Sequence, residues 1–178
     1  DTGTEGSILL DNMKKLDVDP RVVEEVFISH AHFDHVGGLS SFLNKNNDVK
    51  IYVPPSFRGV YHGREPIHVN RPMELHEHFY STGEIDQIEQ SLVVQTDKGL
   101  VVLVGCSHPM MNDILSTASQ FGNIYGIVGG LHGFREFELF RDLELICPTH
   151  CTQHIAEIER LYPEKYIEGG AGRVIEIQ

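Results

Sequence analysis

The fold of this chain is decided by one stretch, His30-Ala31-His32-Phe33-Asp34-His35. Its histidines and aspartate supply imidazole nitrogens and carboxylate oxygens, the donors that suit zinc and, less selectively, iron or manganese. Successive side chains of an extended segment point to opposite faces, so His30 and His32 can face one metal ion together. Asp34 and His35 are then free to address a second ion. The stretch therefore predicts a metal-binding loop, and the alternative is a solvated polar loop at a strand end.

The residues on either side of this stretch predict the elements that hold it. The apolar run Val26-Phe27-Ile28 lies within a strand predicted over residues 24–29, which delivers the loop. Gly37 and Gly38 let the backbone turn closely past the metal ions before a helix begins at Leu39.

The rest of the chain alternates between helical and strand patterns. Apolar residues at helical spacing predict helices over residues 6–16, 39–46, 109–121 and 152–162. Apolar runs predict further strands over residues 50–53, 91–96, 100–104, 124–128, 145–147, 166–167 and 173–177. Asp97-Lys98-Gly99 predicts a hairpin between the strands at 91–96 and 100–104, and Thr152 is a plausible N-cap for the last helix.

Two further histidines follow predicted strands directly. His108 comes just after Val101–Val104, and His150 comes just after Leu145–Cys147. Loops at one edge of a sheet can converge, so both histidines are candidates for the same centre as His30. A third strand ends in Gly129-Gly130-Leu131-His132.

Residues 56–89 lack a clear period and predict a loop and hairpin region that covers the site. This region contains His62, His68, His76 and His78. The pair His76-x-His78 imitates a metal-binding pair, but no aspartate and histidine follow it. We interpret these histidines as residues of the surface or of a substrate lid.

Composition limits the classes of partner. The chain has 178 residues with 40% hydrophobic residues, which predicts a single domain over residues 1–178. The formal net charge is −12, which repels polyphosphates and argues against nucleic-acid binding, although a small anionic substrate stays acceptable beside divalent ions. No apolar run is long enough to span a membrane and no signal peptide is visible.

The three cysteines, an odd count, predict a reduced, cytoplasmic setting. Cys147 and Cys151 flank His150 and could suggest a zinc knuckle, but no second ligand pair has the spacing of a zinc finger. We expect Cys106 and Cys151 to be small buried residues that pack the loops.

Taken together, these motifs resemble a known family. His30-x-His32-x-Asp34-His35 with Gly37-Gly38 resembles the signature of the metallo-β-lactamase-fold hydrolase superfamily. The motifs that end at His108, His132 and His150 resemble the branch of 7,8-dihydropterin-6-methyl-4-(β-D-ribofuranosyl)aminobenzene-5'-phosphate synthase-like proteins. The resemblance implies an α/β fold, a four-layer αββα sandwich of two mixed sheets between helices. The first strands of that fold are missing before Asp1, so the domain is expected to be N-terminally incomplete.

The resemblance also implies the roles of individual residues. His30, His32 and His108 would form a first metal site, and Asp34, His35 and His150 a second, for two divalent ions, zinc or else manganese or iron. Asp1 would support the metal loop from behind. Many members carry a bridging aspartate after the strand that here ends in Gly129-Gly130, and this chain has Leu131-His132 instead, which leaves a one-metal centre open.

The predicted function is a metal-dependent hydrolase that acts on a small phosphate ester, with phosphodiesters favoured. Asp34 is the candidate to orient or deprotonate the attacking water, and His132 the candidate to stabilise charge on the substrate. A pterin-pathway synthase and a non-catalytic metal-binding module are the alternatives. The sequence leaves the oligomeric state open.

Overall fold

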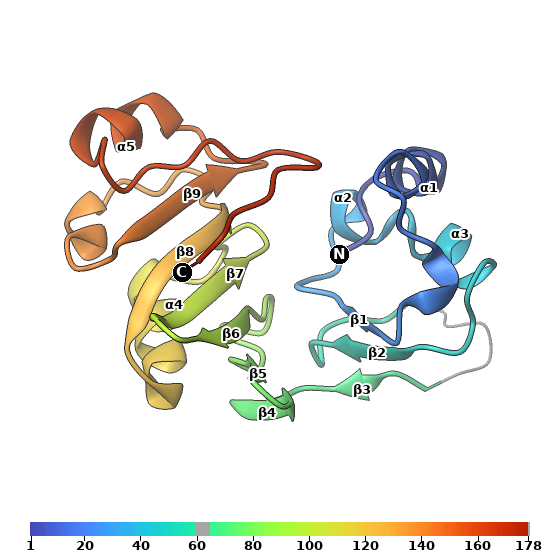
Figure 1. The fold of residues 1–178 in the computed structure, drawn as a ribbon. Coiled ribbons are helices and arrows are strands. Elements are labelled where there is room, and N and C mark those ends of the chain that lie inside the picture. Colours follow the sequence, from blue (N-terminus) through green and yellow to red (C-terminus); the bar gives the residue numbers. More distant parts are fainter. Residues whose placement is uncertain (60–64, 178) are drawn as a thin grey trace.

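Two β-sheets form the centre of the molecule (Figure 1). The computed structural model describes residues 1–59 and 65–177. The smaller sheet contains β1 (Glu25–Phe27), β2 (Lys50–Val53) and β3 (Ile67–His68). The larger sheet contains β4 (Met73–His76), β5 (Phe79–Ser81), β6 (Leu92–Thr96), β7 (Gly99–Val104), β8 (Ile124–Gly130) and β9 (Leu145–Thr149).

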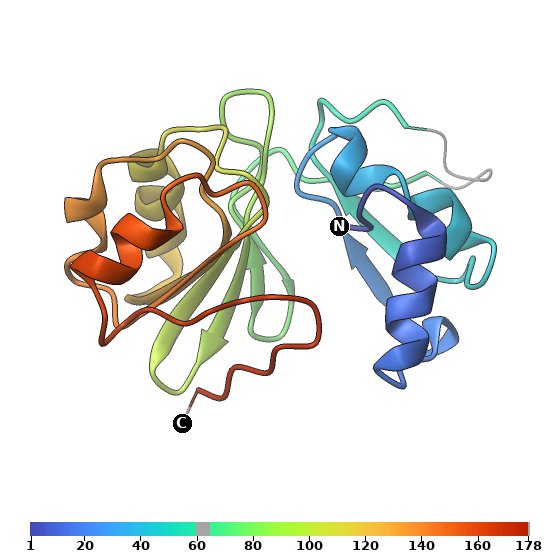
Figure 2. The same ribbon diagram turned by 90° about the horizontal axis from the view of Figure 1, so that it is seen from above.

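Helices cover the outer face of each sheet. They are α1 (Gly6–Lys15), α2 (Phe33–Val36), α3 (Leu39–Leu43), α4 (Met111–Ala118) and α5 (Ile155–Leu161). Seen from above, the first three helices lie outside the smaller sheet, and α4 and α5 lie outside the larger one (Figure 2). The layers therefore follow the order helix, sheet, sheet, helix, which confirms the predicted αββα arrangement.

The strand directions bring several loops to one edge. In the larger sheet β4 to β7 pair antiparallel, whereas β7, β8 and β9 are parallel, so the chain leaves these last three strands at the same edge. The β6–β7 hairpin matches the prediction from Asp97-Lys98-Gly99. The smaller sheet is parallel throughout, so the expectation of two mixed sheets was wrong for it. The crossover through α2 and α3 accounts for the parallel pairing of β1 with β2.

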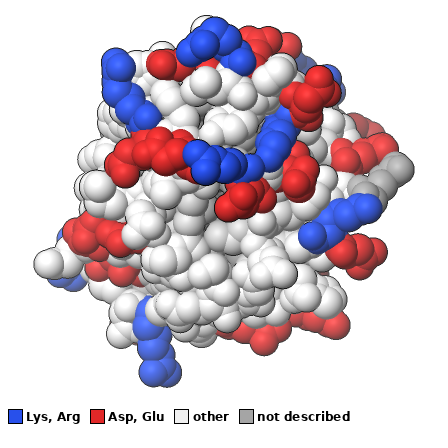
Figure 3. Space-filling view, turned by 90° about the vertical axis from the view of Figure 1, so that its left-hand side faces the viewer, with Lys and Arg blue, Asp and Glu red and all other residues white. Residues whose placement is uncertain are grey.

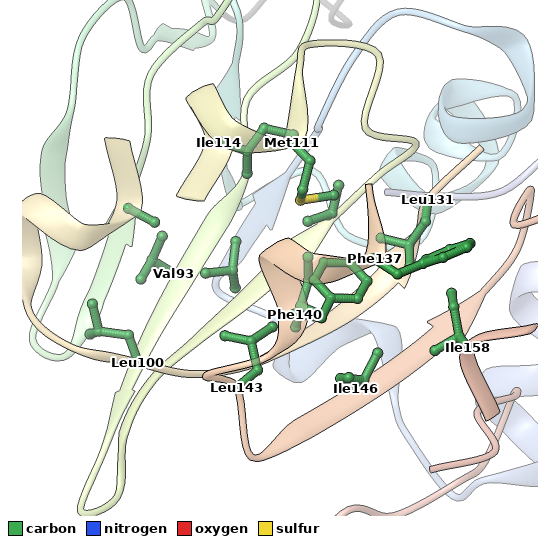
Figure 4. Packing of buried hydrophobic residues seen from close by; sticks show 14 residues of the cluster. Val93, Leu100, Met111, Ile114, Leu131, Phe137, Phe140, Leu143, Ile146 and Ile158 are labelled. Carbon is green, nitrogen blue, oxygen red and sulfur yellow. The ribbon is translucent and has the colours of Figure 1, made fainter. Parts of the chain in front are cut away.

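Each sheet has its own apolar core against its helices. In the larger half, Ile114 of α4 and Ile158 of α5 are fully buried, with Phe140 and Ile146 packed nearby (Figure 4). In the smaller half, side chains of β1 and β2 pack against α3, and Leu9 and Met13 of α1 complete the cluster. Burial of these apolar residues stabilises the strand ends from which the site is built.

The last quarter of the chain departs from the predicted elements. The final helix begins at Ile155 and not at Thr152, because the Thr152 hydroxyl donates a hydrogen bond to the carbonyl of Thr149 and accepts one from the amide of Leu131. Residues 166–167 contribute a single bridge between Tyr166 and Ile146, and residues 173–177 form no strand, so both predicted strands were wrong. The segment between these two predicted strands, Gly169-Gly170-Ala171-Gly172, has three glycines and one alanine. It therefore offers no large side chain that could pack against a sheet.

The helices predicted at 39–46 and 109–121 are shorter than expected. The first ends at Leu43, and the Asn46 side chain donates to the carbonyls of Pro20 and Val23 in place of a further helical turn. The second begins at Met111 and closes with a 3₁₀ turn at Ser119–Phe121.

The histidines of the central hairpin lie away from the metal-binding loop. His76 and His78 are exposed, and His76 borders a hollow with Glu24 and Glu25 at the beginning of β1, whereas the loop follows the end of β1. These two histidines therefore belong to the surface and not to a lid. His62 lies outside the described residues.

Charged side chains of both signs share the molecular surface. On the face shown in Figure 3, the basic side chains at the top are interspersed with acidic ones, and the lower part is mostly uncharged. Among the described residues, no helix has the length and apolarity that crossing a membrane requires.

Candidate metal centre

The loop after β1 brings two of the predicted histidines into contact. His30 is fully buried, and its Nε2 lies 3.0 Å from Nδ1 of His32. Their ring centroids are 4.6 Å apart. As predicted from the alternation of an extended segment, both imidazoles face the same side of the loop.

His108 completes this first group from the other sheet. It follows β7, and its ring centroid lies 4.7 Å from that of His30 and 4.6 Å from that of His32. Its Nε2 is buried and has no hydrogen-bond partner among the described residues. A buried nitrogen without a partner is costly, and a metal ion held by three imidazoles would satisfy it.

A second group forms directly beside the first. Nε2 of His150, which follows β9, lies 3.1 Å from Oδ2 of Asp34, and Nε2 of His35 lies 3.7 Å from the same oxygen. The ring centroids of His35 and His30 are 4.1 Å apart, so the two groups adjoin. The structure thus brings together all six residues that the sequence analysis names as ligands.

The Asp1 carboxylate holds the first loop from behind. It accepts hydrogen bonds from the Ser29 amide and hydroxyl, each 2.7 Å long, and contacts Nδ1 of His35 at 2.6 Å. A proton on Nδ1 leaves Nε2 as the free lone pair, which faces the site. This contact confirms the supporting role that the family resemblance implies for Asp1.

Glu89 holds the second loop, and the sequence analysis missed it. Its side chain is 1% exposed, and its carboxylate accepts hydrogen bonds from the amides of Cys106, Ser107 and His108. No periodicity or motif marks Glu89. A single acidic residue before a strand usually lies in solvent. The available signal was the predicted hairpin, because its register, continued three residues beyond Leu92 and Leu103, sets Glu89 opposite Cys106.

The cysteines contribute more to the site than packing. Sγ of Cys106 lies 3.2 Å from Nε2 of His35 and 3.3 Å from Sγ of Cys151. Burial raises the pKa of the Cys106 thiol. The sequence analysis expected both thiols to be small buried residues that pack the loops. Cys106 is buried and Cys151 is half-buried, and both belong to groups of donor atoms that are close enough to hold a metal ion. Their adjacency to His108 and His150 was the available signal.

His132 lies at the rim of the site. It is exposed, its backbone is left-handed with φ of 46°, and its ring centroid lies 5.1 Å from that of His108. A hollow of about 410 Å³ opens beside it, with Met110, Phe134 and Arg135 among its lining residues. The site therefore opens onto a space that offers both apolar surface and a cationic side chain.

The electrostatics keep the buried imidazoles neutral. Burial, followed by the charges of His35, His108 and His32, lowers the pKa of His30 to about 3. Burial is also the largest cause that lowers the pKa values of His35 and His108. A neutral imidazole is the form that binds a metal ion, so the donor set fits divalent cations such as zinc.

Comparison with known proteins agrees with this geometry. The model of the metallo-beta-lactamase superfamily matches residues 1–108. The chain is 24% identical to a 7,8-dihydropterin-6-methyl-4-(beta-D-ribofuranosyl)-aminobenzene-5'-phosphate synthase from Methanocaldococcus jannaschii, with 98% of this chain and 82% of that protein covered. It is 28% identical over 115 residues to ribonuclease Z from Streptococcus equi subsp. equi, with 60% of this chain and 34% of that enzyme covered.

A solved structure shares nearly the whole fold. Tm1679, described as a metal-dependent hydrolase of the beta-lactamase superfamily, superposes with a TM-score of 0.81 at 24% sequence identity. The match covers 99% of this chain and 87% of that one. The two sheets and their helices thus have a counterpart in a solved structure.

Proposed function

Because this chain belongs to the metallo-beta-lactamase superfamily, we propose that it is a metal-dependent hydrolase of small phosphate esters, with phosphodiesters favoured. The observation that carries the proposal is the convergence of the two groups of donors, the first of which contains the buried, partnerless Nε2 of His108. We assign His30, His32 and His108 to one ion, and Asp34, His35 and His150 to a second. Zinc suits these donors best, and manganese or iron is the alternative.

The metal ions would supply the activation of water and the charge stabilisation that the reaction requires. When bound, two divalent ions lower the pKa of water towards ~7 and stabilise charge on the leaving oxygen of a displaced group. The protein residues then have to orient the water and the ester. Asp34, 46% exposed beside Nε2 of His150, is in a position to accept a proton from the attacking water.

The hollow beside His108 supports a small anionic substrate. Arg135 and His132 can bind phosphate oxygens, and Met110 and Phe134 can contact the organic part of the ester. A ribonuclease cleaves phosphodiester bonds, so the partial match to ribonuclease Z favours this bond type. The net charge of −12 disfavours a nucleic acid as the substrate, and we propose a small molecule in the cytoplasm.

The test is hydrolysis of bis(p-nitrophenyl) phosphate. We expect elemental analysis to find about two divalent ions per chain, and we expect chelation to abolish turnover and zinc or manganese to restore it. Asp34→Asn should lower turnover by at least ~10²-fold, whereas Asp97→Asn in the exposed β6–β7 turn should not. Full activity of metal-loaded Asp34→Asn contradicts the assigned role. Metal binding without turnover favours a non-catalytic metal-binding module.

His132 is tested separately because its role differs from that of a ligand. We expect His132→Ala to leave the metal content unchanged and to lower turnover by about 10²-fold, the scale for loss of one group that stabilises an oxyanion. His68→Ala, on the exposed strand β3, is the matched control. Loss of one ion would make His132 a ligand, and no effect on either quantity would make it a loop residue.

The match to the pterin synthase over 98% of the chain favours a second candidate function. Under this alternative the same centre would join the 6-methyl carbon of a dihydropterin, with loss of a leaving group from that carbon, to a ribofuranosylaminobenzene phosphate, which gives the pterin-linked product in the relative's name. Mass spectrometry of incubations with a dihydropterin and a ribofuranosylaminobenzene phosphate would detect that product. Its formation, without hydrolysis of the model diester, would replace the hydrolase proposal.

A further inference from the structure

The thiol of Cys106 lies between the two groups of donors. Its Sγ and ligand atoms of His30 and His108 lie within 4.8 Å of one another. The same holds for its Sγ with ligand atoms of His35 and His150. Cys106 is 3% exposed and is therefore held in this position by the packing of the loop. No other single side chain belongs to both of these groups within the described ranges, 1–59 and 65–177.

The strand that precedes the position of the absent bridging aspartate has no room for a side chain at its last residue, Gly130. A Cβ atom on Gly130, at the end of β8, would collide with the carbonyl oxygen of Gly105 and would lie 2.9 Å from Sγ of Cys151. It would also lie 3.2 Å from Cα of Cys106. The loop that carries Cys106 therefore fills the space next to β8, and it offers a sulfur where the family resemblance leads us to expect a carboxylate.

We propose that Cys106 is a thiolate ligand shared by the two metal positions, in place of the absent bridging aspartate. The inference rests on the proposed metal centre. A thiolate sulfur has more than one lone pair and can bind two cations, which a histidine cannot do through a single nitrogen. When the sulfur binds, the thiol proton is released to solvent and no other bond changes. A thiolate also favours zinc over manganese, because soft ligands select soft cations.

The other two cysteines have different surroundings and serve as controls. The Cys151 thiol donates to Sγ of Cys106 at 3.3 Å, so it can stabilise the thiolate through a hydrogen bond without being a ligand. Sγ of Cys147 lies on β9 close to Gly169 and Thr149 and belongs to none of the donor groups. Since the chain has three cysteines, Cys147→Ser/Cys151→Ser retains Cys106 as its only thiol.

The experiment is a cobalt titration of the reduced full-length protein, monitored by absorption. A cobalt ion bound to a thiolate gives a near-ultraviolet charge-transfer band, which nitrogen and oxygen ligands do not give. We expect the band in the wild type and in Cys147→Ser/Cys151→Ser, and we expect it to grow over both the first and the second equivalent of cobalt. Cys106→Ser should lose the band and should bind zinc at least ~100-fold more weakly, since even groups that only orient ligands change affinity by about 10–100-fold.

The outcomes separate this inference from the proposed function. A wild type that binds no metal overturns the metal centre and the thiolate together. A wild type that binds cobalt without the band overturns the thiolate alone and leaves the hydrolase proposal standing. A charge-transfer band that stops growing after one equivalent of cobalt overturns the proposal that both metal positions share Cys106.

Two further results address folding and oxidation. If circular dichroism shows that Cys106→Ser does not fold, the band of Cys147→Ser/Cys151→Ser decides, because it can come only from Cys106. A disulfide between Cys106 and Cys151 in protein purified under reductant, detected by mass spectrometry, would overturn the inference, since a disulfide sulfur cannot supply a thiolate.

Discussion

The loop at residues 30–35 and the loop at residues 105–108 bring histidines to the same point by different means. The first carries four candidate ligands within six residues and is supported by Asp1, whose side chain is 27% exposed. The second carries one histidine and Cys106, and it is supported by the buried carboxylate of Glu89. Both loops are thus supported by a carboxylate from another part of the chain, but the first supplies four candidate ligands from one local motif and the second supplies a histidine and a cysteine.

Backbone conformation accounts for this difference. Ser107 adopts a left-handed conformation with φ of 55°, and the consecutive amides of Cys106, Ser107 and His108 all point at Glu89. Successive amides in such a turn form a concavity that binds an anion. A protein carboxylate fills it here, so the second loop depends on a buried charge and the first on a more accessible one.

Glu89→Ala should have the largest effect on stability. It leaves the amides of Cys106, Ser107 and His108 without their acceptor, and each unsatisfied buried amide costs about 1–3 kcal/mol. We expect urea denaturation of the metal-free protein to show a loss of at least ~3 kcal/mol in the free energy of unfolding. Glu77→Ala, at a side chain 81% exposed, should be neutral. Equal stability of the two variants would show that Glu89 does not support the loop.

Asp1→Asn should have an intermediate effect, on metal affinity more than on stability. The carboxylate selects the Nδ1 proton of His35, and loss of such a partner weakens metal binding by about 10–100-fold. Competition with a chelator measures this change, and Asp11→Asn on the exposed face of α1 is the control. An unchanged affinity with a changed free energy of unfolding would make Asp1 a residue of the fold alone.

Acid should lower the free energy of unfolding of the metal-free protein, and His30 in the first loop should make the largest contribution. Burial lowers the pKa of His30 to about 3, so between about pH 3 and the ordinary histidine value of 6.5 the unfolded state binds more protons than the folded state. Stability is therefore complete above pH 6.5 and falls progressively as the pH decreases from 6.5 towards 3. Urea midpoints measured at pH 7.5, 6 and 5, values chosen as roughly spanning this window, should decline. His30→Asn should flatten the profile, and a wild-type profile that is already flat would contradict the burial argument.

His76→Ala and His78→Ala should have the smallest effects. Both side chains are exposed, and the two positions lie outside the groups of candidate ligands. Surface substitutions of this kind change stability by less than ~0.5 kcal/mol, and metal content should not change. Loss of metal in either variant would show that the hairpin contributes a ligand and would extend the centre beyond the two loops.

The fold was predictable from the sequence where the pattern was strong and local. Apolar runs on either side of the Asp97-Lys98-Gly99 turn were sufficient to predict the β6–β7 hairpin. The strand predicted over residues 173–177 did not form, because a short apolar run becomes a strand only when it pairs with the edge of a sheet. The Thr152 hydroxyl forms hydrogen bonds with the Leu131 amide and the Thr149 carbonyl and does not cap the last helix. A cap predicted only from the residues next to Thr152 could not include the contact with Leu131.

The sequence was sufficient to predict that His30 and His32 lie on the same side of their loop, because the alternation of an extended segment is a property of the local backbone. It also determined that His108 and His150 share an edge, since both follow apolar strands. The surroundings of Cys106 and the burial of Glu89 follow from tertiary packing. Cys106 meets His35 across 71 positions, so this contact exists only after the two halves of the molecule have packed together. Glu89 meets Cys106 across 17 positions because both flank the β6–β7 hairpin, and the folded chain then removes the carboxylate from water.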